Sequence, residues 1–169
     1  MPQQAWYTRT ERPDDVACVH EINADAFPTS EEAELVDALR ADPAWLDGLS
    51  IVSVDAEDRP VGFALLTRCH VDDAPALCLA PCAVATAYQR TGAGSAAIIA
   101  ALDAARDMGE STVVVLGHPD YYPRFGFRRA VDHGIRLSIE VPEGALMVLS
   151  LDGTDVPSGT VRYAAPFGI

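Results

Sequence analysis

The order of hydrophobic and polar positions divides the chain into short segments with two different periods. Continuous or alternating apolar runs rich in β-branched residues predict strands, whereas apolar positions three to four residues apart predict helices. The predicted strands cover residues 6–10, 49–55, 61–71, 77–84, 112–116, 135–141 and 145–151. The predicted helices cover residues 13–26, about 29–39 and 95–108. The expected order is β-α-α-β-β-β-α-β-α-β with a C-terminal addition, in which a fourth helix without assigned bounds stands before the last strand and the runs at 135–141 and 145–151 are the weaker strands. This order is typical of a mixed α/β fold.

Turn and capping residues set the boundaries in the first half of this pattern. Pro13 opens the first helix, and Pro28 ends it. Thr29 and Glu32 have the spacing of a capping box, which predicts that the second helix begins with them. The turn at residues 57–60 joins two strand-like runs, so we expect an antiparallel hairpin there.

Length and composition limit the class of protein. The chain has 169 residues, of which 49% are hydrophobic, so it can bury a sizeable core. We expect one domain over residues 1–169, with a core at 5–152 and an extension at 153–169. No apolar run approaches the roughly 20 residues of a membrane span, and the N-terminus lacks the apolar segment of a signal peptide. We therefore expect a cytoplasmic protein with no membrane partner.

The chain is strongly acidic. Its formal net charge is −13, and its 12 lysine and arginine positions are all arginine. Genome bias or adaptation to salt explains this composition more simply than a functional role does. An acidic surface disfavours nucleic-acid binding, so we expect no nucleic-acid partner. It also repels polyanions, so a phosphorylated cofactor requires local binding groups.

The cysteines show no metal-ligand spacing. They stand at Cys18, Cys69, Cys78 and Cys82. A zinc site is the less favoured alternative, because free cysteine usually behaves as a small buried hydrophobic residue. We interpret the four residues as core thiols in a reducing compartment and expect no metal.

Residues 79–127 are the most specific part of the chain. A predicted strand runs into the loop Gln89-Arg90-Thr91-Gly92-Ala93-Gly94, which opens an alanine-rich helix at Ser95. Free N–H groups at a helix N-terminus carry partial positive charge and bind phosphate. A short strand and then a segment with two adjacent tyrosines, Tyr121 and Tyr122, follow. This order predicts a phosphorylated cofactor with a tyrosine beside it.

The same segments resemble a known family. Residues 89–94 fit the loop Q/R-x-x-G-x-G/A, and residues 116–127 fit the motif LG-x-P-x-x-Y-x-R-F-G-F. These motifs resemble the GNAT superfamily of acyl-CoA-dependent N-acetyltransferases, and the second is similar to that of a small bacterial branch. Residues 26–40 and the C-terminal residues 161–167 are weaker matches. The resemblance spans most of the chain.

A dinucleotide-binding domain is the main alternative to an acyl-CoA site. Residues 92–97 also match the pattern G-x-G-x-x-A, which by itself is weak. That motif calls for an acidic residue about twenty positions on, at the end of the next strand. The chain has no carboxylate there before Asp120. A Walker A loop is excluded because the sequence Gly-Lys-Ser/Thr is missing.

The resemblance implies a central twisted, mostly antiparallel sheet, splayed between its fourth and fifth strands and flanked by helices. Acetyl-CoA lies in the gap of that fold. Backbone groups of Cys82, Ala83 and Val84 would bind the pantetheine arm. The pyrophosphate would be surrounded by Gln89, Arg90, Thr91, Gly92, Ala93, Gly94 and Ser95. Glycine is expected at positions 92 and 94 because a Cβ there would block the approach of backbone to phosphate.

The aromatic segment carries the further roles that the resemblance implies. Tyr122 matches the general-acid tyrosine and would protonate the CoA sulfur. Tyr121 is interpreted as a core aromatic. Phe125 either contacts the cofactor or packs in the core, and Arg124 either reaches the adenosine end of the cofactor or faces solvent.

Acetyl transfer to an amine sets its own chemical requirements. An alkylammonium with a pKa near 10.4 must lose a proton before its nitrogen can attack, so a base or water must accept that proton. Backbone N–H groups, such as that of Val84, are candidates for binding the oxyanion. His118 is a candidate base at the end of a strand, and Glu31 is a candidate base or acceptor-orienting residue. Asp25 and Glu34 lie in the same helical region as Glu31.

Two functions are compatible with these features of the sequence. The first is an acyl-CoA-dependent N-acetyltransferase that acts on a primary amine of a small molecule or peptide by direct attack, through a tetrahedral intermediate. The second is a non-catalytic acyl-CoA-binding or sensing module on the same fold. The sequence leaves the acceptor open, as well as the acyl length and the choice between monomer and homodimer.

Overall fold

The computed structural model describes residues 6–169, so the first five residues, including the predicted start of the core, lie outside the described part. In this part nine strands form one connected sheet with the order β1-β2-β3-β4-β5-β8-β6, and β9 pairs with both β3 and β7. The strands are β1 (Tyr7–Thr10), β2 (Trp45–Val54), β3 (Pro60–Val71), β4 (Ala74–Val84), β5 (Thr112–Leu116), β6 (Arg128–Arg129), β7 (Ile135–Arg136), β8 (Leu146–Ser150) and β9 (Gly159–Arg162).

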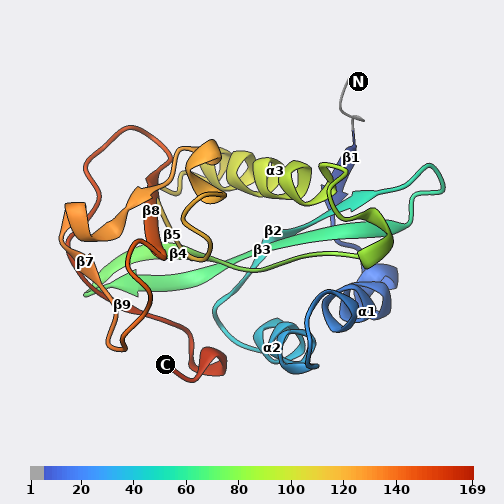
Figure 1. The fold of residues 1–169 in the computed structure, drawn as a ribbon, viewed down its shortest axis with the longest axis horizontal. Helices are drawn as coiled ribbons and strands as arrows, with labels where there is room; N and C mark the ends of the chain where they lie inside the picture. Colours follow the sequence, from blue (N-terminus) through green and yellow to red (C-terminus); the bar gives the residue numbers. More distant parts are fainter. Residues whose placement is uncertain (1–5) are drawn as a thin grey trace.

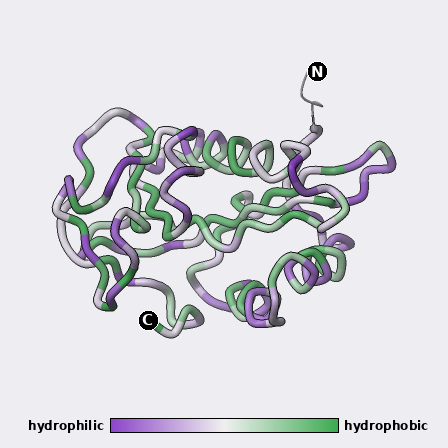
Figure 2. The backbone as a smooth tube through the Cα atoms, viewed as in Figure 1, coloured by the Kyte–Doolittle hydropathy of each residue, from purple (hydrophilic) through white to green (hydrophobic). Residues whose placement is uncertain are grey.

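Helices cover both faces of the sheet. The helix α3 (Ala93–Asp107) lies on one face, and α1 (Val16–Ala26) and α2 (Glu31–Arg40) lie on the other (Figure 1). Ala97, Ala101 and Ala105 of α3 are fully buried, and their small side chains let the helix lie close to the strands. Figure 2 shows hydrophobic residues concentrated along the central strands and polar residues at the β2–β3 turn. This arrangement confirms the predicted mixed α/β fold.

The sheet divides at the junction of β4 and β5. These two strands run parallel and pair only at Leu77 with Val113 and at Cys78 with Val114. Beyond this point β4 continues to Val84 without β5 beside it, which leaves an open edge. The predicted gap between the fourth and fifth strands is therefore present.

The predicted capping box of the second helix is wrong. Ser30, not Thr29, is the N-cap of α2, and its hydroxyl donates to the Glu34 carboxylate at 3.3 Å. Thr29 instead accepts a hydrogen bond from the N–H of Glu31 at 3.3 Å. Thr29 and Ser30 are both typical N-cap residues, so spacing alone did not distinguish them.

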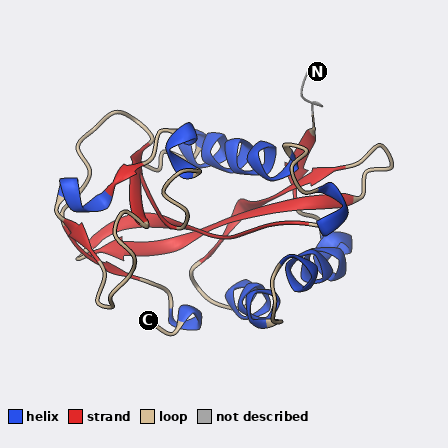
Figure 3. Cartoon of the chain, in the orientation of Figure 1, coloured by secondary structure: helices blue, strands red, loops and turns tan. Residues whose placement is uncertain are grey.

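The predicted strand at 135–141 and the helix before the last strand are also wrong. Only the two residues of β7 pair with another strand, because the following segment contains Pro142 and a left-handed glycine, Gly144. In place of the helix, the chain forms short 3₁₀ turns at Tyr122–Phe125 and Ala130–His133. Figure 3 shows the segment between β5 and β8 as short elements joined by loops. The strand β2 also differs from the prediction, since it begins at Trp45 with a register shift before Ser50.

None of the helices in residues 6–169 has both the length and the apolar character needed to cross a membrane.

Candidate functional site

A bulge in β4 shapes the open edge of the gap. The pairing with β3 shifts between Ala64 opposite Cys82 and Leu66 opposite Leu79, so Ala80 and Pro81 together face a single residue of β3. Proline has no N–H for the ladder, and strands accommodate it at such bulges. The bulge re-aims the last residues of β4 toward the gap.

Backbone groups of β4 beyond the bulge point into the gap. The N–H of Ala85 donates to the Val61 carbonyl at 2.9 Å, and hydrogen-bonded positions alternate along an antiparallel ladder. Cys82 and Val84 therefore direct their N–H and C=O groups away from β3. The Val84 carbonyl accepts a hydrogen bond from the Gln89 side chain at 3.4 Å. These groups are available to a ligand that lies along β4, as predicted for the pantetheine arm.

The glycine loop turns directly into α3. Gly92 is the N-cap of the helix in the left-handed region, with φ +89°. The first helical hydrogen bond runs from the N–H of Ala96 to the Gly92 carbonyl at 2.9 Å, so the N–H groups of residues 93–95 lie outside the helical ladder. Arg90 also has a positive φ of 64°. Successive N–H groups in such a turn form a concavity that suits an anion.

The two loop glycines are required for different reasons. A Cβ at Gly92 would find only Trp6 Cδ1 at 4.0 Å, so the backbone angle, and not crowding, favours glycine there. A Cβ at Gly94 would lie 2.8 Å from Cγ2 of Val84. Gly94 therefore lets α3 begin directly against the end of β4. The close approach of backbone to phosphate at both glycines stays a prediction.

Residues far away in sequence hold this loop in place. Ser53 of β2 is fully buried and donates to the Ala93 carbonyl at 2.9 Å. A Cβ at Gly62 of β3 would lie 2.3 Å from the Ser53 hydroxyl oxygen, so glycine makes room for this bond. The indole N–H of Trp6 donates to the Thr91 carbonyl at 3.0 Å. The sequence did not predict these three residues, because no local pattern signals a contact between β2 and the start of α3.

Tyr122 lies in the cleft at the end of β5. Its ring packs against Gly117, where a Cβ would lie 2.4 Å from the ring, so the glycine of the motif gives the tyrosine its position. Burial is the main reason that the pKa of Tyr122 is raised above its ordinary value, and contact with Cys82 and Tyr121 adds to the shift. Burial also raises the pKa of the Cys82 thiol to about 12. Both groups are therefore neutral at physiological pH.

Tyr121 has a more specific position than a core aromatic. Its hydroxyl forms a hydrogen bond with the Ser95 hydroxyl at 2.8 Å, which joins the aromatic turn to the start of α3. Its ring meets that of Tyr122 edge to face, with centroids 5.0 Å apart. Phe125 packs against both rings and does not line the cleft, so its predicted contact with the cofactor stays a prediction.

These parts form one cleft of about 250 Å³. It brings together the end of β4, the glycine loop, the start of α3, the two tyrosines and the end of α1. The lining residues are Ala26, Phe27, Cys82, Ala83, Val84, Gln89, Gly94, Ile98, Tyr121 and Tyr122. Of the predicted site residues, Cys82, Ala83, Val84, Gln89, Gly94 and Tyr122 thus lie together.

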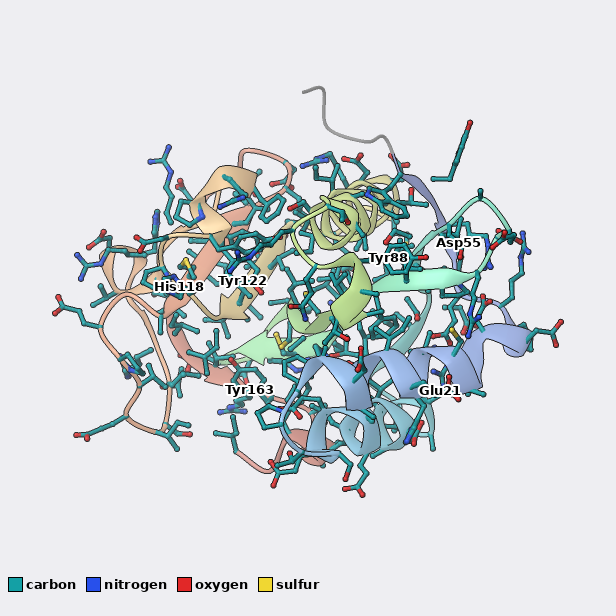
Figure 4. All side chains as sticks on the ribbon, turned by 45° about the vertical axis from the view of Figure 1, so that its right-hand side comes forward. Glu21, Asp55, Tyr88, His118, Tyr122 and Tyr163 are labelled. Atoms are coloured by element: carbon teal, nitrogen blue, oxygen red, sulfur yellow. The ribbon has the colours of Figure 1, made fainter. Side chains whose placement is uncertain are left out.

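The candidate bases lie outside this cleft. The His118 side chain is 72% exposed and lies 3.9 Å from Asp120. Figure 4 shows it on the side of Tyr122 that faces away from α3. Glu31 is exposed at the start of α2. No carboxylate or imidazole is among the described residues that line the cleft, so a direct role of either residue as base stays a prediction.

Asp25 connects α1 to the glycine loop region. Its carboxylate accepts hydrogen bonds from the Thr86 N–H at 2.7 Å and from the Thr86 hydroxyl at 2.8 Å. These bonds lower the pKa of Asp25, although the group is exposed. Thr86 stands in the 3₁₀ turn Thr86–Tyr88 just before the loop. The bonds therefore fix the end of α1 beside the cofactor loop, and Asp25 is engaged there as a structural acceptor.

The cysteines are dispersed through the fold. Cys69 and Cys78 are buried, and Cys18 and Cys82 are partly buried. Within residues 6–169, no three or more His, Cys, Asp or Glu side chains are grouped in a way that could hold a metal ion.

Comparison with known proteins places this cleft in a family. The model of the "Acetyltransferase (GNAT) family" matches residues 16–127, which contain the β4 edge, the glycine loop and Tyr122. The chain is 36% identical over 161 residues to the "Uncharacterized N-acetyltransferase YjhQ" of Escherichia coli K12, covering 90% of this chain and 88% of the relative. It is 31% identical over 163 residues to the "Uncharacterized N-acetyltransferase YhbS" of the same strain, covering 94% and 96%.

Solved structures agree with this assignment. The crystal structure of YhbS from Escherichia coli in complex with CoA has a TM-score of 0.88 and 28% identity, and covers 100% of this chain and 95% of that one. A GNAT family acetyltransferase from Brucella melitensis, in complex with acetyl-CoA, has a TM-score of 0.79 and 29% identity, and covers 96% and 98%. The chain belongs to the GNAT family of acetyltransferases.

Proposed function

We propose that this protein is an N-acetyltransferase that transfers the acetyl group of acetyl-CoA to a primary amine. The acceptor is a small molecule or a peptide, the amine attacks directly through a tetrahedral intermediate, and the enzyme acts as a monomer or a homodimer. One observation carries the proposal. A single cleft joins the open edge of β4, the glycine loop and a partly buried tyrosine, Tyr122. These are the groups needed to hold a phosphorylated thioester and to donate a proton at its sulfur.

The cleft residues have distinct roles toward acetyl-CoA. The outward backbone groups of Cys82 and Val84 suit the amides of the pantetheine arm, and the free N–H groups at residues 93–95 suit the pyrophosphate. A net charge of −13 repels this polyanion at long range, so these local donors must supply the binding. The CoA and acetyl-CoA bound to the two solved relatives support this choice of cofactor.

Tyr122 is the proposed proton donor. Acetyl-CoA supplies an activated acetyl thioester when it is bound. The amine nitrogen bonds to the acetyl carbon, the carbon–sulfur bond breaks, and the sulfur keeps the electron pair. Because its pKa is raised, the Tyr122 hydroxyl is protonated and can donate to that sulfur as negative charge develops on it. Of the outward N–H groups at Cys82 and Val84, the one that does not bind the pantetheine arm is available to the oxyanion.

The amine proton leaves by way of water. No carboxylate or imidazole lines the cleft within the described residues, so no side chain there can serve as a strong base. The reaction therefore starts from the neutral amine, which is the minor form of an alkylamine near neutral pH. Tyr122 recovers its proton from water after each turnover, which completes the proton balance.

The replacement Tyr122→Phe tests the proposal. It removes the hydroxyl and keeps the ring, so the rate of CoA release with an amine acceptor should fall by about 100-fold. Affinity for acetyl-CoA, measured by calorimetry, should change little. Tyr121→Phe is the matched control, because it removes a neighbouring hydroxyl that contacts Ser95 instead of the reacting atoms. Normal turnover by Tyr122→Phe would exclude the tyrosine as proton donor.

A non-catalytic acyl-CoA-binding or sensing module is the second candidate. The described residues that line the cleft include no carboxylate or imidazole, and this favours the second candidate. A panel of primary amines separates the two functions, with CoA release as the measurement. The sensing module would be favoured if the protein binds acetyl-CoA tightly but releases no CoA with any amine, whether a small molecule or a peptide.

A further inference from the structure

Cys82 and Tyr122 meet across the gap from the two halves of the divided sheet. Cys82 follows the bulge of β4, whereas Tyr122 belongs to the turn after β5. Both residues line the cofactor cleft, and both pack against the same hydrophobic core. The hydroxyl of Tyr122 contacts the thiol of Cys82 as a hydrogen-bond partner. The tyrosine therefore spans the gap and brings its hydroxyl to the edge of β4.

The ring of Tyr122 is fixed more firmly than its hydroxyl hydrogen. A Cβ at Gly117 would lie 2.4 Å from the ring, and the Tyr121 ring meets it edge to face. These contacts hold the ring, but the hydroxyl hydrogen still rotates about the carbon–oxygen bond. The hydroxyl of Tyr121 forms its hydrogen bond with Ser95. The Cys82 sulfur is thus the group that directs the Tyr122 O–H bond toward β4.

A neutral thiol suits this task because it is a weak acceptor. Burial raises the pKa of the Cys82 thiol to about 12, so the sulfur carries no charge at physiological pH. It therefore orients the O–H bond without binding the proton strongly. A carboxylate at the same place would accept a much stronger hydrogen bond and would compete with a sulfur on which negative charge develops.

We propose that Cys82 is a positioning residue that directs the Tyr122 hydroxyl toward the thioester sulfur. The inference rests on the proposed function, in which acetyl-CoA lies along β4 and Tyr122 donates the proton. A hydroxyl directed toward β4 is then directed toward the thioester, which is the orientation that proton transfer requires. As the carbon–sulfur bond breaks, the proton of Tyr122 moves to the departing sulfur, which keeps the electron pair. Cys82 itself gives up no proton and forms no bond with the substrate.

The variants Cys82→Ala and Cys82→Ser test this role through the rate of CoA release with a primary amine at saturating acetyl-CoA. Alanine removes the partner of the hydroxyl, so kcat should fall by about tenfold, the size of one hydrogen bond. Serine provides an oxygen acceptor in place of the sulfur and should restore most of that rate. Affinity for acetyl-CoA, measured by calorimetry, should change by less than about twofold in both variants, because the backbone groups at position 82 remain.

A double-mutant cycle gives a readout that a packing role would not produce. The Tyr122→Phe protein has no hydroxyl to direct, so adding Cys82→Ala to it should cause no further loss of kcat. A tenfold loss in both backgrounds would instead show that Cys82 only supports the cleft by packing, and it would overturn the positioning role. Equal losses in Cys82→Ala and Cys82→Ser would overturn it as well.

Cys78→Ala is the matched control. Cys78 is a buried thiol of the same strand, but it packs in a separate hydrophobic cluster with Val114 and does not line the cleft. This variant should keep the wild-type kcat. If it loses as much rate as Cys82→Ala does, the effect is a general consequence of removing a buried thiol from β4, and the positioning role is wrong.

The outcomes separate this inference from the proposed function. A wild-type kcat in Cys82→Ala would overturn the positioning role and leave the acetyltransferase proposal intact. Normal turnover by Tyr122→Phe would remove the proton donor and the positioning role together. Failure of the wild-type protein to release CoA with any primary amine would overturn the proposed function and this inference with it.

Discussion

The cofactor region, residues 79–127, and the opposite face of the sheet differ in how they satisfy buried polar groups. Buried side-chain atoms without a hydrogen-bond partner among the described residues are Asn23 Oδ1, Glu32 Oε2, Arg40 Nε, Thr67 Oγ1 and Tyr163 Oη. They belong to α1, α2, β3 and the C-terminal segment, and none lies in the cofactor region. Within that region Ser95 pairs with Tyr121, and Ser53 of β2 serves the start of α3.

This difference indicates that the cofactor region is organised before any ligand binds. The Ser95–Tyr121 and Ser53–Ala93 hydrogen bonds join the aromatic turn and the start of α3 to their neighbours, so we expect these elements to keep their positions without a ligand. On the opposite face, each unpaired buried group costs about 1–3 kcal/mol. Asn23 Oδ1 and Thr67 Oγ1 belong to fully buried side chains and have no partner among the described residues, so we expect each to carry this cost. Binding of CoA should therefore depend on fixed local geometry, and changes on the two faces should have separable effects.

The largest expected effect comes from breaking the geometry of the cofactor loop. Gly92→Val places a β-branched residue at φ +89°, which should turn the adjacent N–H groups away from the pyrophosphate. Loss of two charge-assisted hydrogen bonds should weaken acetyl-CoA binding by about 100-fold. Calorimetry with acetyl-CoA measures this change directly.

Gly109→Val is the control for backbone strain. Gly109 follows α3 with φ +84°, and a Cβ there would meet nothing within 4 Å. The two variants should therefore lose similar stability, but only Gly92→Val should lose cofactor affinity. Equal loss of affinity in both would show that general destabilisation, and not the loop, controls binding.

Much of the cofactor region could be predicted from the sequence because its main features are encoded by residues close together in the chain. The glycine at position 92, the helix that starts after it and the spacing from Tyr122 to Gly126 are all contained in short motifs, whereas the positive φ of Gly92 came from the structure. The gap between β4 and β5 followed from the resemblance of those motifs to a family. The structure then confirmed it through pairing at only two positions.

The remaining features depend on contacts that sequence order does not reveal. Ser53 and Gly62 support the start of α3 from other strands, and their sequence neighbourhood reads as ordinary strand. His118 is a candidate base because it follows β5, but its side chain is exposed to solvent and lies outside the cleft. The short β7 was overpredicted because the apolar residues after it suggested a strand, whereas Pro142 and Gly144 end regular pairing.

The pH dependence of turnover tests the cofactor region further, because it separates the ionisation of Tyr122 from the ionisation of the acceptor amine. The pKa of Tyr122 is raised above its ordinary value of 10.0, so the active, protonated form persists to higher pH than for a free tyrosine. The neutral fraction of an alkylamine increases about tenfold per pH unit below its pKa. We expect kcat/KM for the amine to rise about tenfold per unit from about pH 7 to pH 9, without a decline before about pH 10.

Steady-state rates at saturating acetyl-CoA provide this profile. Tyr122→Phe should show the same rising limb at a lower rate, because that limb belongs to the acceptor. A decline below about pH 10 that is present in the wild type and absent from Tyr122→Phe would contradict the raised pKa of the tyrosine.

The smallest expected effect is the most direct test of the difference between the two faces. Ser53→Ala removes a buried hydroxyl that donates to the Ala93 carbonyl, so the free energy of unfolding should fall by about 1 kcal/mol. Thr67→Val removes a buried hydroxyl without a partner among the described residues and keeps the side-chain shape. It should raise the free energy of unfolding by about 1 kcal/mol. For a chain of this length, each change corresponds to roughly 2–4 °C in Tm.

The opposite signs of these two changes are decisive, because both variants delete one hydroxyl from a fully buried strand residue. Urea unfolding of both variants beside the wild type, without ligand, measures the difference under one condition. Ser53→Ala should in addition weaken acetyl-CoA binding severalfold, since the start of α3 loses its anchor. If Thr67→Val destabilises the protein as Ser53→Ala does, the Thr67 hydroxyl has a partner in solution, and the two faces do not differ in the way their buried polar groups are satisfied.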